Sequence, residues 1–209
     1  ACAPFRRLHL CNKNMEKMDT NNDDSSKAKH KLLAEVCLAA KFEGESIKHY
    51  SEKYDLKYPS SGSSFTTCTM LARSFADIGD IVRGRDLYRG NKKENKQRDK
   101  LDENLKKIFG KIHEGLSKNG AQKHYKGDPE FFKLREDWWT ANRETVWKAI
   151  TCSDELKDAS YFRATCSDSD GKSQYQTQNQ CRCTKSIGAN ANQVPTYFDY
   201  VPQYLRWFE

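Results

Sequence analysis

The sequence predicts a mainly α fold, a disulfide-stapled helical bundle with an irregular N-terminal part. Four segments repeat apolar residues at the three- and four-residue spacing of an amphipathic helix, with polar links between them. No segment alternates apolar and polar residues over any length, so a β-sandwich or a doubly wound sheet is not expected. Eight mostly well-separated cysteines in 209 residues favour structural disulfides and therefore an oxidising, extracellular setting.

The first helix is expected over residues 30–54, and a turn-rich break follows it. Its apolar face carries Leu33, Val36, Ala40, Ile47, Tyr50 and Tyr54. Residues 58–64 combine one proline, one glycine and four serines, a composition that ends a helix. The second helix then begins near Phe65 and ends at Gly84 or Gly90. Its expected core positions are Leu71, Phe75, Ile78 and Val82.

The third helix is expected from about Lys92 to Leu116. Its apolar stripe consists of Leu101, Leu105, Ile108, Ile112 and Leu116. For the fourth helix, Asp128 is the expected N-cap and Pro129 the first helical residue, and the helix continues to about Ile150.

The remaining sequence is less regular. The adjacent Trp138 and Trp139 of the fourth helix are interpreted as one core residue and one inter-helix contact, not as an exposed platform. Residues 151–196 hold four cysteines without a sustained period, so we expect an irregular, disulfide-stapled segment. Pro202 then opens a further helix.

The spacing of the cysteines restricts how they can pair. Cys37 precedes the end of the first helix by roughly 25 Å, whereas Cys68 follows the break, so these two exceed the disulfide reach of about 7 Å between Cα atoms. Cys181 and Cys183 are one residue apart and are expected to take different partners. The natural candidates for them are Cys2 and Cys11, although the sequence leaves other connectivities open.

Positive charge is concentrated between residues 83 and 126. This segment has 14 Lys or Arg and 6 Asp or Glu, a net charge of +8, while the whole chain carries +7. Six lysines of the third helix share the face opposite the apolar stripe, in a row of about 37 Å. They are Lys93, Lys96, Lys100, Lys107, Lys111 and Lys118. Such a row suits a long polyanion, because each neutralised anionic group releases counterions; the alternative is an ordinary solvated face, interrupted by Glu103 and Glu114.

No motif of a catalytic or metal site is present in the sequence. It has no nucleophile elbow, no phosphate-binding loop, no His-Glu-x-x-His and no Cys-x-x-Cys. Asp77 and Asp80 lie three residues apart on a helix, but we interpret them as partners of Arg73, Arg83 or Arg85. We therefore expect no enzyme, no cofactor and no metal.

Three classes of function remain to be weighed. An extracellular binding module fits the cysteines and the basic helix. A secreted basic enzyme, such as a nuclease or phospholipase, needs a convergent histidine pocket that five scattered histidines do not suggest. A nucleic-acid binder fits the basic helix, but the cysteine usage argues against an intracellular setting. No spanning segment or signal peptide is recognisable, so any anchor or export signal is expected outside this sequence.

Five segments are similar to one known family. They are residues 2–11 (CAPFRRLHLC), 38–47 (LAAKFEGESI), 72–84 (ARSFADIGDIVRG), 138–143 (WWTANR) and 201–209 (VPQYLRWFE). Together they run through essentially the whole chain in order. The chain thus resembles the Duffy-binding-like domain, alpha class, of the malaria parasite's erythrocyte membrane protein 1 family, whose members are variant surface antigens of infected red cells.

The resemblance implies an adhesin of three subdomains and no enzymatic activity. Residues 1–30 would be the irregular, disulfide-bearing first subdomain with the 170–196 loop packed on it. Residues 31–209 would be the helical-bundle second subdomain, breaking off where a third begins. The family's alpha-class domains mediate rosetting, the binding of infected to uninfected red cells. The implied location is the extracellular face of the infected erythrocyte membrane, with any transmembrane segment outside this chain.

The implied partners are host erythrocyte surface receptors and sulfated glycans such as heparan sulfate, and not nucleic acid. The predicted glycan contacts are Lys93, Lys96, Lys100, Lys107, Lys111 and Lys118, with Arg83 and Arg85 ranked below them. In the alternative, the partner is a protein receptor such as complement receptor one or a neutral blood-group sugar, and the basic helix is only solvated.

The resemblance also implies a cysteine pairing. By similarity to the wider family, Cys68 should bridge to Cys166, which leaves Cys37 and Cys152 as a further helix-to-helix bridge. The recognisable motifs are expected to be largely structural. The residues expected to hold the bundle are Arg73, Asp77, Asp80 and Trp138.

Overall fold

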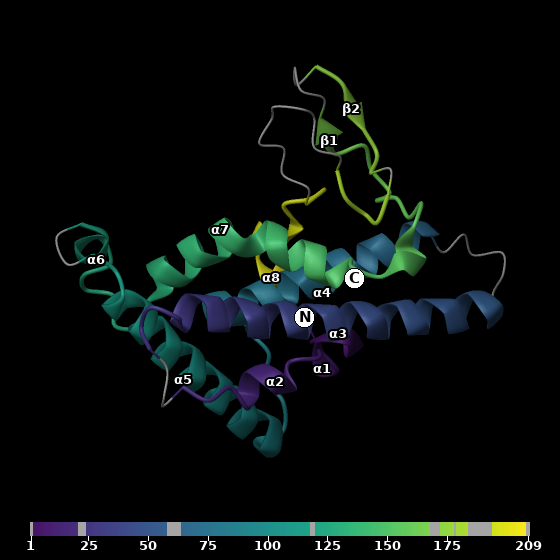
Figure 1. Ribbon diagram of the computed structural model, residues 1–209. Coiled ribbons are helices and arrows are strands. Elements are labelled where there is room, and N and C mark those ends of the chain that lie inside the picture. The colour runs from purple at the N-terminus through teal and green to yellow at the C-terminus, as the bar shows by residue number, and fades with distance from the viewer. Residues whose placement is uncertain are drawn as a thin grey trace.

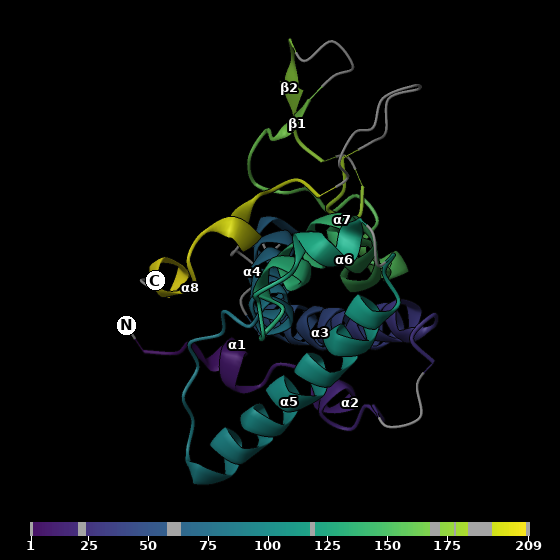
Figure 2. The ribbon, with the colours of Figure 1, turned by 90° about the vertical axis from the view of Figure 1, so that its left-hand side faces the viewer.

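The computed structural model describes residues 2–20, 24–57, 64–117, 120–167, 172–177, 179–183 and 194–207. Three long helices, α3 (Ala28–Lys57), α4 (Ser64–Arg83) and α7 (Phe132–Ile150), pack against one another. A fourth, α5 (Lys92–Glu114), crosses this layer at an angle and contacts α3 and α7 (Figures 1 and 2). The mainly α, disulfide-bearing bundle expected from the sequence is confirmed.

Short elements complete the described chain. Before the bundle lie α1 (Phe5–Leu8) and α2 (Lys13–Glu16), and α6 (Ala121–His124) lies between α5 and α7. After it come the 3-10 turn η1 (Asp154–Leu156), the antiparallel pair β1 (Cys166–Ser167) and β2 (Gln174–Tyr175), the 3-10 turn η2 (Phe198–Tyr200) and α8 (Gln203–Arg206). In both views the β pair lies on the opposite side of the α3–α4–α7 layer from α1 and α2.

Aromatic packing and one glycine bring the three long helices together. The ring of Phe75 on α4 lies 5.0 Å from that of Trp139 and 5.1 Å from that of Trp147, both fully buried on α7. At Gly44 of α3, a Cβ atom would lie 2.1 Å from the carbonyl oxygen of Ile150. Only glycine therefore permits this close approach of α3 to the end of α7.

Most of the predicted core positions are buried. Those of α4 and α5 are confirmed, namely Leu71, Phe75, Ile78, Val82, Leu101, Leu105, Ile108 and Ile112. Leu116 is half-buried against the core, and both Trp138 and Trp139 are buried. The helix α4 ends at Arg83 because Gly84, with φ of +71°, adopts the left-handed conformation that ends helices.

Two local predictions are wrong. On α3 the side chain of Tyr50 is 63% exposed; the side chain of Tyr54 is outside the described residues. At α7 the N-cap is Phe131, with φ of +57°, and not Asp128. The Asp128 carboxylate instead accepts a hydrogen bond from the Lys133 backbone N–H at 2.7 Å, so it anchors a turn that precedes the helix.

The disulfide pairing also differs from the one that the resemblance implied. Cys68 bonds to Cys181, not to Cys166, and Cys166 bonds to Cys183. The first bond attaches Cys181 to α4. The second joins Cys166 of β1 to Cys183, within the same segment after α7. The indole N–H of Trp147 donates to the Cys181 carbonyl at 3.1 Å, which fixes this segment on α7.

The four other cysteines are free thiols, namely Cys2, Cys11, Cys37 and Cys152. The expected bridges of Cys2 and Cys11 to Cys181 and Cys183 are therefore wrong, because the latter two bond to Cys68 and Cys166. The expected Cys37–Cys152 bridge does not form. The reason is that Gly44 sits against Ile150, so Cys152 faces a level of α3 about 10 Å beyond Cys37.

Residues 179–183 of the 170–196 loop are attached to α4 and α7, not to the N-terminal stretch as expected, and β2 pairs with β1 above the helices. Arg182 donates to the backbone carbonyls of Lys148 and Thr151 at 2.9 and 2.7 Å. Among the described residues, no helix is long and apolar enough to cross a membrane.

Candidate functional site

The basic helix α5 begins with a complete capping box. The Asn91 side chain accepts hydrogen bonds from the backbone N–H groups of Lys93 and Glu94, and the Glu94 carboxylate accepts from the Asn91 N–H at 2.7 Å. The Tyr88 hydroxyl donates to the same carboxylate at 3.0 Å. Glu94 is thereby directed into the cap, and the lysines around it remain on the outer surface.

The predicted lysine row divides into two parts. Lys93, Lys96 and Lys100 are exposed and form no ion pair with any described residue. They lie on the half of α5 that projects from the bundle in both views (Figures 1 and 2). We call these three residues the α5 tip. Their positions span about 10 Å of the helix.

The rest of the row is less available. The Lys107 ammonium lies 2.7 Å from the Glu103 carboxylate and lowers the pKa of that carboxyl through a hydrogen bond and charge. Lys111 is half-buried, and Lys118 lies outside the described residues. The α5 tip is therefore the part of the predicted row that presents unpaired positive charge.

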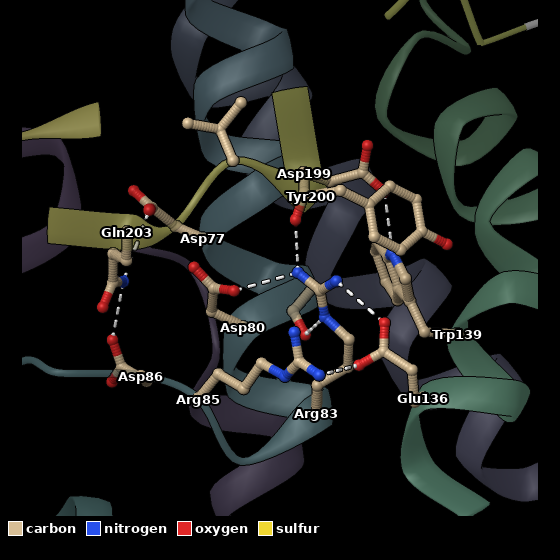
Figure 3. A network of polar contacts seen from close by, with 12 residues as sticks. Asp77, Asp80, Arg83, Arg85, Asp86, Glu136, Trp139, Asp199, Tyr200 and Gln203 are labelled. Atoms are coloured by element: carbon tan, nitrogen blue, oxygen red, sulfur yellow. Dashed lines mark hydrogen bonds and ion pairs between the residues drawn. The ribbon is translucent and has the colours of Figure 1, made fainter. Parts of the chain in front are cut away.

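The prediction of Arg83 as a glycan contact is wrong, because the residue is only 1% exposed. Its guanidinium donates to Asp80 at 2.9 Å and to the Asp199 carbonyl at 2.5 Å, in the network shown in Figure 3. Arg85 at the rim of this network is exposed, but it is held 2.8 Å from Glu136.

Asp77 and Asp80, which were interpreted from the sequence as structural, lie in the same buried network as Arg83. Asp77 and Asp80 both pair with Arg206, Asp77 at 2.9 Å. Burial raises the pKa of the Asp80 carboxyl to about 6, against the opposing effect of Arg206 and Arg83. These groups fasten the end of α4 to α8, so they serve the fold. Among the described residues no cluster of His, Cys, Asp and Glu is arranged to bind a metal.

Two exposed lysines at α2 were not among the predicted contacts. The Asn104 amide of α5 donates to the Glu16 carbonyl of α2 at 3.0 Å, which places the end of α2 against the middle of α5. Lys17, the next residue, is exposed, as is Lys13 one turn earlier. The short helix α2 therefore brings two further exposed lysines to the side of α5 that it contacts. No sequence signal pointed to it, because α2 is one turn long in a polar stretch.

The Duffy binding domain family matches residues 1–206. The chain belongs to this family. No curated protein matches it. Among solved structures, this Duffy binding domain is similar to the N-terminal NTS-DBL1-alpha and CIDR-gamma double domain of the PfEMP1 protein from Plasmodium falciparum, varO strain. Identity is 45% and the TM-score is 0.75, covering 100% of this chain and 27% of that one.

Two further structures narrow the relationship. The NTS-DBL1(alpha-1) domain from the same strain is 45% identical with a TM-score of 0.73, covering 100% of this chain and 42% of that one. The resemblance to the alpha class is thus confirmed. The PfEMP1 IT4var13 DBLbeta domain, described as ICAM-1-binding, is 36% identical with a TM-score of 0.70, covering 98% and 41%. This chain therefore spans less than half of the length of each of these three relatives.

Proposed function

We propose that this chain is part of an extracellular host-cell adhesion domain that binds sulfated glycans of the heparan sulfate type on red cells. The observation that carries the proposal is the α5 tip, three exposed lysines on a projecting helix that have no carboxylate partner among the residues the structure describes. Membership of the family supports adhesion as the general role, and the same relatives support an extracellular location in general.

The placement of the tip is unfavourable for the helix itself. Lys93 and Lys96 lie in and just after the first turn, where the helix dipole is positive and cations are destabilising by a few tenths of a kcal/mol. The capping box offsets this cost and keeps the end of α5 ordered. A sulfate group beside the tip is attracted both by the ammonium groups and by the helix dipole.

The test is retention of the chain on immobilised heparin over a salt gradient. In the variant Lys93→Glu, Lys96→Glu, Lys100→Glu we expect retention to be lost, because each lysine contributes to counterion release. The helical CD signal should stay intact, since glutamate at a helix N-terminus is favourable. Unchanged retention would overturn the assignment of the tip.

A matched variant separates local from overall charge. Lys41→Glu, Lys53→Glu, Lys157→Glu reverses three other exposed lysines and changes the net charge by the same amount. We expect it to keep most of the heparin retention. An equal loss in both variants would mean that retention reports only the net charge of the chain.

A protein receptor is the second candidate, because relatives at 36% and 34% identity are described as ICAM-1-binding and as bound to ICAM-1. A glycan array and a receptor-binding assay on the same sample distinguish the two. Binding to a protein receptor that is unaffected by the charge reversal would leave the α5 tip as a solvated face.

A further inference from the structure

The connection between α4 and α5, residues 84–91, is held at one point by segments from both ends of the described chain. This point is Asp86, whose side chain is 8% exposed. The Arg7 guanidinium of α1 donates to the Asp86 carboxylate from two nitrogens, at 3.0 and 2.5 Å. From α8, the Gln203 amide donates to the same carboxylate at 2.9 Å and accepts from the Leu87 backbone N–H at 2.6 Å (Figure 3). The state of α1 and of α8 is therefore felt at the start of the path to α5.

Tyr88 carries this contact on to α5. Its ring lies 4.7 Å from the Arg7 guanidinium, and the residue is 7% exposed. Its hydroxyl donates to the Glu94 carboxylate at 3.0 Å, and that carboxylate accepts from the Asn91 backbone N–H. At Gly90 a Cβ atom would lie 2.6 Å from the Glu94 Cβ, so this close approach requires glycine. The capping box of α5 is thus tied to Asp86 through buried groups.

The first half of α5 has little support from the core. The side chains of α5 that are buried begin at Leu101, beyond all three lysines of the tip. A groove of about 530 Å³ separates this half from the stretch of α1 and α2, with Phe42 on one wall and Glu94 and Gln97 on the other. A segment with few buried apolar contacts opens at a low cost in free energy. The orientation of the tip therefore depends on the connection and the cap at its end.

We propose that Asp86 and Tyr88 are positioning residues of the α5 tip. They transmit to its lysines the contacts that Arg7 and Gln203 make with the connection. When one of these contacts is lost, the first turn of α5 opens more often, and a ligand must pay to order it on binding. The effect on binding rests on the proposed function, whereas the effect on the order of α5 does not.

The first test needs no ligand and uses amide hydrogen exchange, followed residue by residue by NMR. Tyr88→Phe removes only the hydroxyl that meets Glu94, and it should speed exchange of the Asn91 and Glu94 amides by about threefold or more. Gln203→Ala should speed the same two amides, although Gln203 lies on α8 and its hydrogen bonds go to α4 and the connection. This second effect is the decisive one, because only coupling through Asp86 carries it to α5.

The matched control is Gln176→Ala. It removes a glutamine whose amide donates to the Phe162 carbonyl at 3.1 Å, far along the chain from the connection, and should leave the α5 amides unchanged. Unchanged α5 amides in Gln203→Ala overturn the coupling. An equal rise in the buried amides of α7 also overturns it, because the whole bundle has then loosened.

The second test is the salt dependence of heparin binding. Tyr88→Phe and Gln203→Ala keep the net charge, so affinity should fall about threefold at every salt concentration while the slope of log Kd against log salt stays the same. A merely electrostatic change alters that slope, as expected for Lys93→Glu, Lys96→Glu, Lys100→Glu. A changed slope in the two neutral variants, or unchanged affinity in spite of faster exchange, contradicts the positioning role.

The two proposals fail in different ways. A parent chain that does not bind heparin overturns the proposed function, and the exchange rates of Asn91 and Glu94 then still decide whether Asp86 and Tyr88 position α5. Heparin binding by the parent chain together with exchange that is insensitive to Gln203→Ala leaves the proposed function standing and overturns this one.

Discussion

The α4–α7 side and the α5 tip use charged residues in opposite ways. At the end of α4, Arg83 and Arg206 are almost completely buried, and each is bonded to carboxylates or carbonyls. On the α5 tip the lysines are exposed and have no carboxylate partner among the described residues. Both disulfides lie on the α4–α7 side, and none joins α5 to the rest of the described chain.

The difference separates residues that stabilise the fold from residues that are available for binding. A buried charge without its partner costs several kcal/mol, so the network at α4 cannot exchange its partners for a ligand. An exposed lysine contributes little to the free energy of unfolding, so residues of the α5 tip can be replaced without loss of the fold. If that separation holds, changes inside the α4 network should cost far more stability than changes on α5.

Removal of the disulfides should cost the most stability. By the loop-entropy relation, Cys68→Ala with Cys181→Ala should lower the free energy of unfolding by about 4–5 kcal/mol, because this bond closes a loop of 113 residues. Cys166→Ala with Cys183→Ala removes the bond between two cysteines that are 17 positions apart, and should lower the free energy of unfolding by about 3 kcal/mol. Urea denaturation measures both. Peptide mapping that finds Cys68 joined to any other cysteine would contradict the pairing.

Loss of Asp199 should come next. Asp199→Ala leaves the buried Arg143 guanidinium and the Trp139 indole N–H without their acceptor, and we expect a loss of about 3–5 kcal/mol in urea denaturation. The matched control is Glu103→Ala on α5, whose exposed ion pair should change the free energy of unfolding far less, because solvent screens it. Similar costs for the two variants would remove the contrast between the regions.

The two regions should also respond to pH with opposite signs. The pKa of buried Asp80 is about 6 in the folded chain, above the unfolded value of about 4, so the folded state binds the extra proton between these values. The free energy of unfolding contributed by Asp80 should therefore rise as the pH falls through this window, by up to about 1.4 kcal/mol per pH unit.

The comparison is with Asp80→Asn, measured by denaturation from pH 7 to pH 4. The advantage of the parent chain over this variant should grow as the pH falls. For Glu103, whose pKa is lowered by Lys107, the sign is reversed, and the small advantage over Glu103→Gln should fade below about pH 4.5. A difference between the parent chain and Asp80→Asn that is flat or falls on acidification would contradict the role of burial at Asp80.

Local sequence signals predicted the helices well. The stripe of α5 is buried at the predicted positions, and Gly84 ends α4, because periodicity and left-handed caps act within a few residues. The start of α7 was missed by three residues: the Asp128 carboxylate accepts from the backbone N–H of Lys133 in the first turn of α7, but the residues between them form a turn and not a helix. The α3 stripe failed at Tyr50, because the packing of its neighbours decides which flank of a long helix is covered.

The sequence by itself therefore determined the helical periods, the local excess of lysine and the resemblance to the family. The bond between Cys68 and Cys181, the burial of Arg83 and the absence of ion pairs at the α5 tip within the described part of the chain all depend on tertiary packing. The physical reason is the sequence separation over which each kind of interaction acts. Periods and caps depend on residues a few positions apart, whereas pairing and burial depend on residues more than 100 positions apart that only packing brings together.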